Sequence, residues 1–256
     1  MRAIWPVFRF HLLQIYRSKL VLLWILFSLF VQYSAVRLMH ASTVHYEQAQ
    51  MTLGMREIVI ALIYVQFFLG SVLATVYGIW VAPYLHEESR APLTYALPVN
   101  KAVFPAVYFI SFLSLYVVQA VAMFASLTTQ FGISIWTNPE FPWAHVGAGS
   151  LLSILALEGL VFGLALFSLV FGKVSAFLGG TALVMVLQVS ALVFKAEWAQ
   201  SGVWYRVYQF LPPLGETLVD LKETRFWEGQ TGLHTLSWVV WLVLFATLFR
   251  LRLNRA

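Results

Sequence analysis

The chain has 256 residues, of which 61% are hydrophobic and only 11% are charged, about half the charged share of an average soluble domain. So much apolar surface exceeds what one soluble core of this size can enclose. The formal net charge of +5 requires no nucleic-acid partner, and the absence of cysteine excludes disulfides, cysteine zinc sites and thiol catalysis.

The N-terminal residues 1–19, which we call the leader, form the first predicted element. Apolar side chains recur there at helical spacing, whereas the arginines at positions 2, 9 and 17 fall on a different face. Pro6 stands where a first helical turn tolerates proline. We expect an amphipathic helix in the membrane interface, with Trp5 as a headgroup-level anchor. Its apolar stripe is predicted to be Ile4, Phe8, Leu12 and Ile15.

The rest of the chain contains long continuous apolar runs, which indicate membrane helices rather than the alternating strands of a barrel. A membrane span needs about 20 largely apolar residues. The sequence therefore predicts an all-α integral membrane protein with a single transmembrane domain over residues 1–256. Its six predicted spans are residues 20–36, 58–82, 103–127, 146–171, 174–194 and 233–249, with a tight turn at Gly172 and Lys173.

The distribution of lysine and arginine predicts the orientation. With a cytoplasmic N-terminus, ten basic residues fall on the inside and six on the outside. Four of them precede the first predicted span and three follow the last. We expect a multi-pass protein of the cell (inner) membrane with both ends in the cytoplasm. Basic helix ends that face anionic headgroups then account for the net charge.

One acidic residue, Glu158, lies near the middle of a predicted span. A charge there costs a few kcal/mol on insertion scales, so the side chain should face other helices or water, or be protonated. We interpret it as a candidate residue of a translocation path. The alternative is a neutral carboxyl group that is hydrogen-bonded to a neighbour such as Gln119 or Gln188.

Residues 195–232 form a longer connection than two adjacent spans require. The segment is rich in tryptophan and tyrosine, which favour the membrane–water boundary, and Leu214, Leu218 and Leu221 share a helical face. We expect one or two short re-entrant helices that cover the exit of a translocation path. The candidate residues of this exit-side segment are Tyr208, Phe210, Pro212, Pro213 and Glu216.

Motifs of membrane enzymes are incomplete. The H-E-x-x-H zinc-protease pattern fails after His86, because the position of its second histidine holds Arg90. A membrane-embedded enzyme of the prenyl-protease kind, using Glu87, Glu88 and His145, remains an alternative. An ion-driven secondary transporter is another, although such carriers usually show internal repeats or several intramembrane charges. No metal site is expected, since His40, His45 and Glu47 are interpreted as solvated.

The segment from Glu87 to Lys101 resembles the first cytoplasmic loop of ABC-2 type transporter permeases. In that family an acidic stretch leads into a short helix and then a Leu-x-Pro-Val-x-Arg/Lys element, which Leu97-Pro98-Val99-Asn100-Lys101 is similar to. The chain has Ala91-Pro92 where the family usually has Gly-Thr. The order of leader, spans and proline-led connection is also similar along the whole chain.

The resemblance implies the transmembrane subunit of an ATP-binding-cassette exporter. Two permease copies or paralogues would work with a dimer of separate ATPase subunits, which bind the ATP and magnesium. The permease chain itself would bind no cofactor, and its cargo is expected to be hydrophobic or amphiphilic. Residues 83–102 are then the coupling loop that docks on the ATPase, with an apolar helix edge inside a polar rim. The expected contact residues are Glu87, Glu88, Arg90, Leu93, Tyr95, Leu97 and Lys101.

Overall fold

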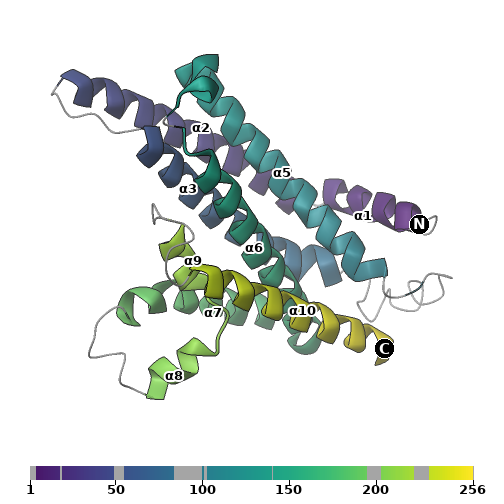
Figure 1. Ribbon diagram of the computed structural model, residues 1–256. Helices are drawn as coiled ribbons and strands as arrows, with labels where there is room; N and C mark the ends of the chain where they lie inside the picture. Colours follow the sequence, from purple (N-terminus) through teal and green to yellow (C-terminus); the bar gives the residue numbers. More distant parts are fainter. Residues whose placement is uncertain are drawn as a thin grey trace.

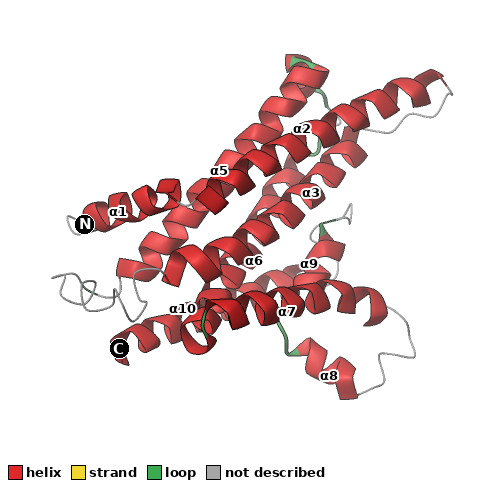
Figure 2. Ribbon diagram, turned by 180° about the vertical axis from the view of Figure 1, so that it is seen from behind, coloured by secondary structure: helices red, strands yellow, loops and turns green. Residues whose placement is uncertain are grey.

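The computed structural model describes residues 4–17, 19–48, 55–83, 100, 103–139, 141–194, 203–221 and 231–255. These residues are almost entirely helical and include no strand, as the sequence predicts (Figures 1 and 2). The long helices are α2 (Lys19–Gln48), α3 (Met55–Val76), α5 (Val103–Phe131), α6 (Trp143–Phe171), α7 (Lys173–Phe194) and α10 (Thr231–Arg255). The shorter ones are α1 (Ile4–Arg17), η1 (Tyr77–Val81), η3 (Ile133–Thr137), α8 (Val203–Gln209) and α9 (Leu214–Asp220).

Five of the six predicted spans coincide with helices that are long and apolar enough to cross a membrane. The apolar stretches of these helices are Val21–Met39, Glu57–Val81, Val103–Phe131, Trp143–Phe171 and Thr231–Leu253. The fifth predicted span, residues 174–194, also forms a helix, α7. Its described apolar stretch, Lys173–Val189, is shorter than a full span. A multi-pass α-helical membrane protein is thus established by length and composition.

Helix α6 occupies the centre of the bundle and packs against α3, η1, α7, α9 and α10 (Figure 1). This helix is apolar on all sides, which is typical of a helix enclosed by others. By contrast, α7 and α10 expose rows of large apolar side chains, which suit contact with lipid. The most exposed of them include Val174, Leu178, Val186, Leu233, Val240 and Val243.

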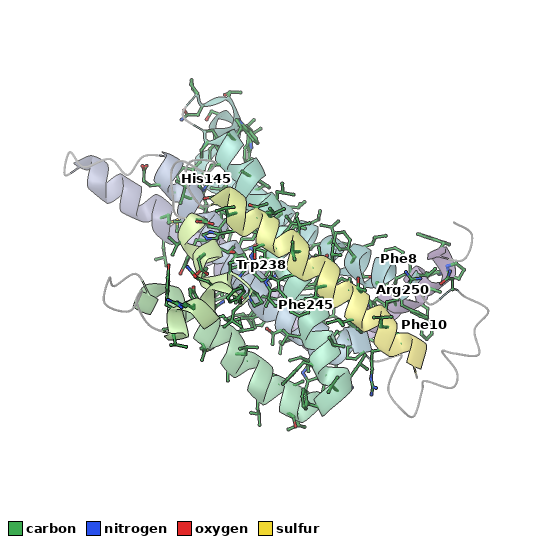
Figure 3. All side chains as sticks on the ribbon, turned by 60° about the horizontal axis from the view of Figure 1, so that its bottom comes forward. Phe8, Phe10, His145, Trp238, Phe245 and Arg250 are labelled. Atoms are coloured by element: carbon green, nitrogen blue, oxygen red, sulfur yellow. The ribbon has the colours of Figure 1, made fainter. Side chains whose placement is uncertain are left out.

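Small residues allow the close contacts of α6. A Cβ atom on Gly78 would stand 2.8 Å from the backbone oxygen of Val161, so η1 and α6 touch through their main chains. On the other side, a Cβ atom on Gly159 would stand 2.8 Å from the ring of Trp238 in α10. Figure 3 shows Trp238 and Phe245 along α10, and Phe245 covers Gly163 in the same way. Glycine at these positions therefore sets the distance between neighbouring helices.

The turn between α6 and α7 is tighter than predicted. Gly172 alone separates the helices, whereas Lys173 is already the first residue of α7. Gly172 has a φ angle of +82°, a conformation that glycine adopts without steric cost, and its N–H donates to the Ser168 carbonyl at 2.9 Å. The Lys173 ammonium lies 5.4 Å from the centroid of the Trp80 ring. This cation–π contact ties the start of α7 to η1.

The leader is a helix, as predicted, but its buried face differs from the predicted stripe. The most buried described side chains of α1 are Val7, His11 and Ile15, which are spaced four residues apart, whereas Phe8 and Leu12 are only half-buried. The helix packs against α2 and α5. Both chain ends lie at the same end of the molecule (Figures 1 and 2). This placement agrees with termini on one side of a membrane.

Candidate functional site in the polar centre of the bundle

The seven residues expected in the coupling loop are not among those that the structure describes. Glu87, Glu88, Arg90, Leu93, Tyr95, Leu97 and Lys101 all lie outside the described ranges. The side chains of His40, His45 and Glu47 are likewise outside the described part. Among the described residues, no group of three or more His, Cys, Asp or Glu side chains is placed to hold a metal ion.

The exit-side segment forms two short helices, α8 and α9, on either side of the two prolines. Tyr208 and Pro213 are buried, Pro212 and Glu216 are half-buried, and Phe210 is 79% exposed. Leu214, Leu218 and Leu221 are buried, so the predicted apolar face of this segment is confirmed. Helix α9 packs against α6, α7 and α10.

Three polar contacts attach this segment to the long helices, and one of them is extended within the segment. Trp238 of α10 donates its indole N–H to the Thr217 hydroxyl at 2.7 Å, and that hydroxyl donates to the Pro213 carbonyl at 2.7 Å. The His234 ring pairs with the Asp220 carboxylate at 2.7 Å. From α6, the His145 ring bonds to the Leu221 carbonyl at 3.1 Å. His145, the candidate of the enzyme hypothesis, thus makes a contact that positions α9.

Glu158 lies near the middle of α6 and is fully buried. Neither of its carboxyl oxygens has a hydrogen-bond partner among the described residues. The expected alternative partners do not bond to it: both amide atoms of Gln119 are also unbonded, and Gln188 donates to the Ser71 hydroxyl at 3.4 Å. The alternative in which one of these glutamines satisfies the carboxyl group is therefore wrong for this conformation.

A histidine from the leader enters the same region of the bundle. His11 is completely buried, and its Nε2 lies 2.6 Å from the hydroxyl of Tyr77 in η1. The Nδ1 atom lies 3.3 Å from the side-chain oxygen of Gln14, and the ring packs at 4.7 Å from the Tyr108 ring. Sequence reasoning missed this residue. The available signal was a histidine at the centre of an otherwise apolar i, i+4 row, Val7–His11–Ile15.

Tyr77 links His11 to the part of α6 that carries Glu158. Its hydroxyl also donates to the Tyr108 carbonyl at 3.3 Å, and the adjacent Gly78 touches Val161, one turn along α6 from Glu158. Tyr77 begins η1, a π-helical turn, and such turns often occur at functional sites. The Ser168 hydroxyl of α6 donates to the Ile79 carbonyl at 3.1 Å, so this backbone oxygen of the π-helical turn has a side-chain donor. We call His11, Tyr77 and Glu158 the buried polar chain.

The burial of His11 predicts an acid-sensitive leader. Desolvation lowers the pKa of His11 from 6.5 to about 4, because the buried ring is more stable without charge. The unfolded chain then binds more protons between these values, so stability is full above pH 6.5 and falls as the pH drops toward 4. The whole shift corresponds to about 3 kcal/mol.

We expect the thermal midpoint of the purified protein to fall between pH 7 and pH 4.5, and the His11→Phe variant to lose part of this dependence. Phenylalanine keeps a ring against Tyr108 but has no group to protonate. The measurement is the midpoint at both pH values for wild type and variant in the same detergent. Equal pH dependence in the two proteins would contradict the assignment to His11.

No known family model, curated protein or solved structure matches this chain. The class of protein therefore follows from the sequence and the structure of the chain. It is an α-helical, multi-pass membrane protein with a fully buried carboxyl group and a polar chain at its centre.

Proposed function

We propose that this protein is the permease subunit of an ATP-driven exporter of the ABC-2 type. It would cross the cell membrane six times with both ends in the cytoplasm, and pair with a second permease copy or paralogue. A dimer of ATPase subunits would supply the energy. The cargo is proposed to be hydrophobic or amphiphilic, in keeping with the aromatic residues of the chain.

The observation that carries the proposal is the unpaired Glu158 carboxyl group at the centre of the bundle. A buried ionisable group in a membrane helix costs stability, and such groups mark pathways for substrates or ions. The connection between α7 and α10 adds support, because α9 packs onto the bundle beside α6 as expected of an exit-side segment. The ion-driven carrier is the second candidate, and the buried polar chain of titratable residues is the observation that favours it.

The coupling loop provides the test of the ATPase partnership. Replacing both Leu93 and Leu97 by aspartate places charges in the expected apolar contact, and burying an unpaired charge costs several kcal/mol. We expect the double variant to insert normally but to lose co-purification of the ATPase. The ATPase rate stimulated in reconstituted vesicles should fall with it.

A control introduces an aspartate outside the coupling loop, beyond the C-terminal end of α5. Ile133 in η3 is 76% exposed, so Ile133→Asp adds a charge without entering the coupling loop. This variant should keep both the bound ATPase and its rate. Retention of both properties in the double variant would contradict the docking assignment and leave the ion-driven carrier as the stronger candidate.

A further inference from the structure

The protonation state of Glu158 follows from its surroundings. Its side chain is fully buried, and both oxygens lack hydrogen-bond partners among the described residues. An ionised carboxylate in such a place would lose its hydration without gaining any donor in return. The neutral acid, which carries one exchangeable proton, is the stable form.

The hydrogen bonds of His11 have a direction. Its Nδ1–H donates to the Gln14 side-chain oxygen at 3.3 Å, which leaves Nε2 as an acceptor for the Tyr77 O–H at 2.6 Å. The Tyr108 carbonyl, at 3.3 Å, is the more distant acceptor for the same proton. The Tyr77 oxygen keeps a lone pair that can receive a proton, and the next residue, Gly78, touches Val161, one turn from Glu158 on α6.

We propose that Glu158 is a proton-binding site of this protein, and that Tyr77 and His11 conduct protons between Glu158 and the side of the bundle where α1 lies. Glu158 gives its proton to the Tyr77 oxygen while the Tyr77 proton moves to His11 Nε2. The products are a carboxylate, an unchanged phenol and an imidazolium ion, so one proton and one positive charge have moved. The imidazolium then releases its Nδ1 proton on the side where Gln14 lies, and a turn of the ring restores the starting tautomer with N–H toward Gln14.

The elements around the buried polar chain supply few other titratable groups that could take up the proton at the depth of Glu158. Tyr108 of α5 packs against this chain, with its ring 4.7 Å from the His11 ring. Of the other elements packed on α6, α3 carries the titratable Tyr64 away from its ends. The remaining described charged or titratable residues of these elements lie toward element ends: Glu57 of α3, Lys173 of α7, Glu216 and Asp220 of α9, and His234, Arg250 and Arg252 of α10. The first hop requires a rotation of the Glu158 side chain or one intervening water, since no direct hydrogen bond joins it to Tyr77.

This site goes beyond the proposed function, because a proton site in the membrane is testable without the ATPase or the exported cargo. The experiment is infrared difference spectroscopy of the full-length protein in lipid vesicles. Wild type should show the carbonyl stretch of a protonated carboxylic acid at pH 7, and Glu158→Gln should lack it. After transfer to D₂O, the shift of this band reports how fast the Glu158 proton exchanges.

Two variants test the path. Tyr77→Phe and His11→Phe keep the rings and remove the conducting groups, so each should slow the exchange at least tenfold. Tyr116→Phe is the matched control, because Tyr116 is also a buried tyrosine of α5 but is not part of the buried polar chain. It should exchange at the wild-type rate.

Three results would overturn the proposal. Absence of the band in wild type at pH 7 would show an ionised carboxyl group. Unchanged exchange in both Tyr77→Phe and His11→Phe would show that these residues do not carry the proton. Slower exchange in Tyr116→Phe alone would place the path through Tyr116 instead. Elution of each variant as a single folded species on size exclusion separates these results from misfolding.

Discussion

Replacing Trp238 by alanine should cause a large loss of stability. The ring is fully buried against Gly159, and its N–H donates to Thr217, so the substitution leaves a cavity and removes one hydrogen bond. Removing a buried tryptophan side chain costs about 3–5 kcal/mol. We expect a marked fall in the thermal midpoint of the detergent-solubilised protein.

Two further variants divide this effect into its parts. Thr217→Val keeps the Trp238 ring but removes the hydroxyl that accepts from Trp238 and donates to Pro213. It leaves the buried indole N–H without its acceptor, which costs about 1–3 kcal/mol. Val240→Ala trims a side chain on the same helix that is 59% exposed, and it should leave the midpoint nearly unchanged. A Trp238→Ala protein as stable as Val240→Ala would contradict the view that α9 is held to the bundle through this ring.

The contacts of Trp238 join two regions that are far apart in the chain. Through Thr217 the ring holds α9, and through Gly159 it touches the residue next to Glu158. On the opposite side of α6, Tyr77 and His11 lead to α1. Contacts of packed side chains therefore run from α9 through α6, near Glu158, to the leader.

The sequence predicted the helices well because apolar runs of span length have few alternative structures. The leader helix was also predictable from its periodicity. Its buried face was not, because His11 is held by Tyr77, a residue 66 positions away, and no local pattern encodes that contact. The π-helical turn of η1 was missed for a similar reason, since its stabilisation includes Ser168 of α6.

The candidate site was predictable only in part. Glu158 stood out as the acidic residue in the middle of a predicted span, and its burial is confirmed. Its predicted partners were wrong: Gln188 bonds to Ser71, and the carboxyl oxygens have no hydrogen-bond partner among the described residues. Which side chains of two neighbouring helices meet depends on how each helix is rotated about its own axis. The apolar runs of the sequence carry little information about that rotation.

Replacing Glu158 by leucine should raise stability and abolish function. An unpaired buried polar group destabilises the protein, so an apolar side chain of similar size should increase the thermal midpoint. The same change removes the proton site at the centre of the bundle. We expect turnover, measured as the ATPase rate of the reconstituted transporter, to fall at least tenfold while the amount of protein in the membrane stays constant.

The Glu158→Gln variant distinguishes the two ways in which the carboxyl group can contribute. Glutamine keeps the polarity and shape of the protonated acid, and it should insert and fold like wild type, but it cannot release a proton to Tyr77. If turnover needs the proton, Gln and Leu should be equally inactive. Activity in Gln but not in Leu would show that polarity alone is needed at this position. Normal activity in Leu would remove Glu158 from the functional site altogether, because a residue whose loss stabilises the fold without affecting turnover has neither a structural nor a mechanistic role.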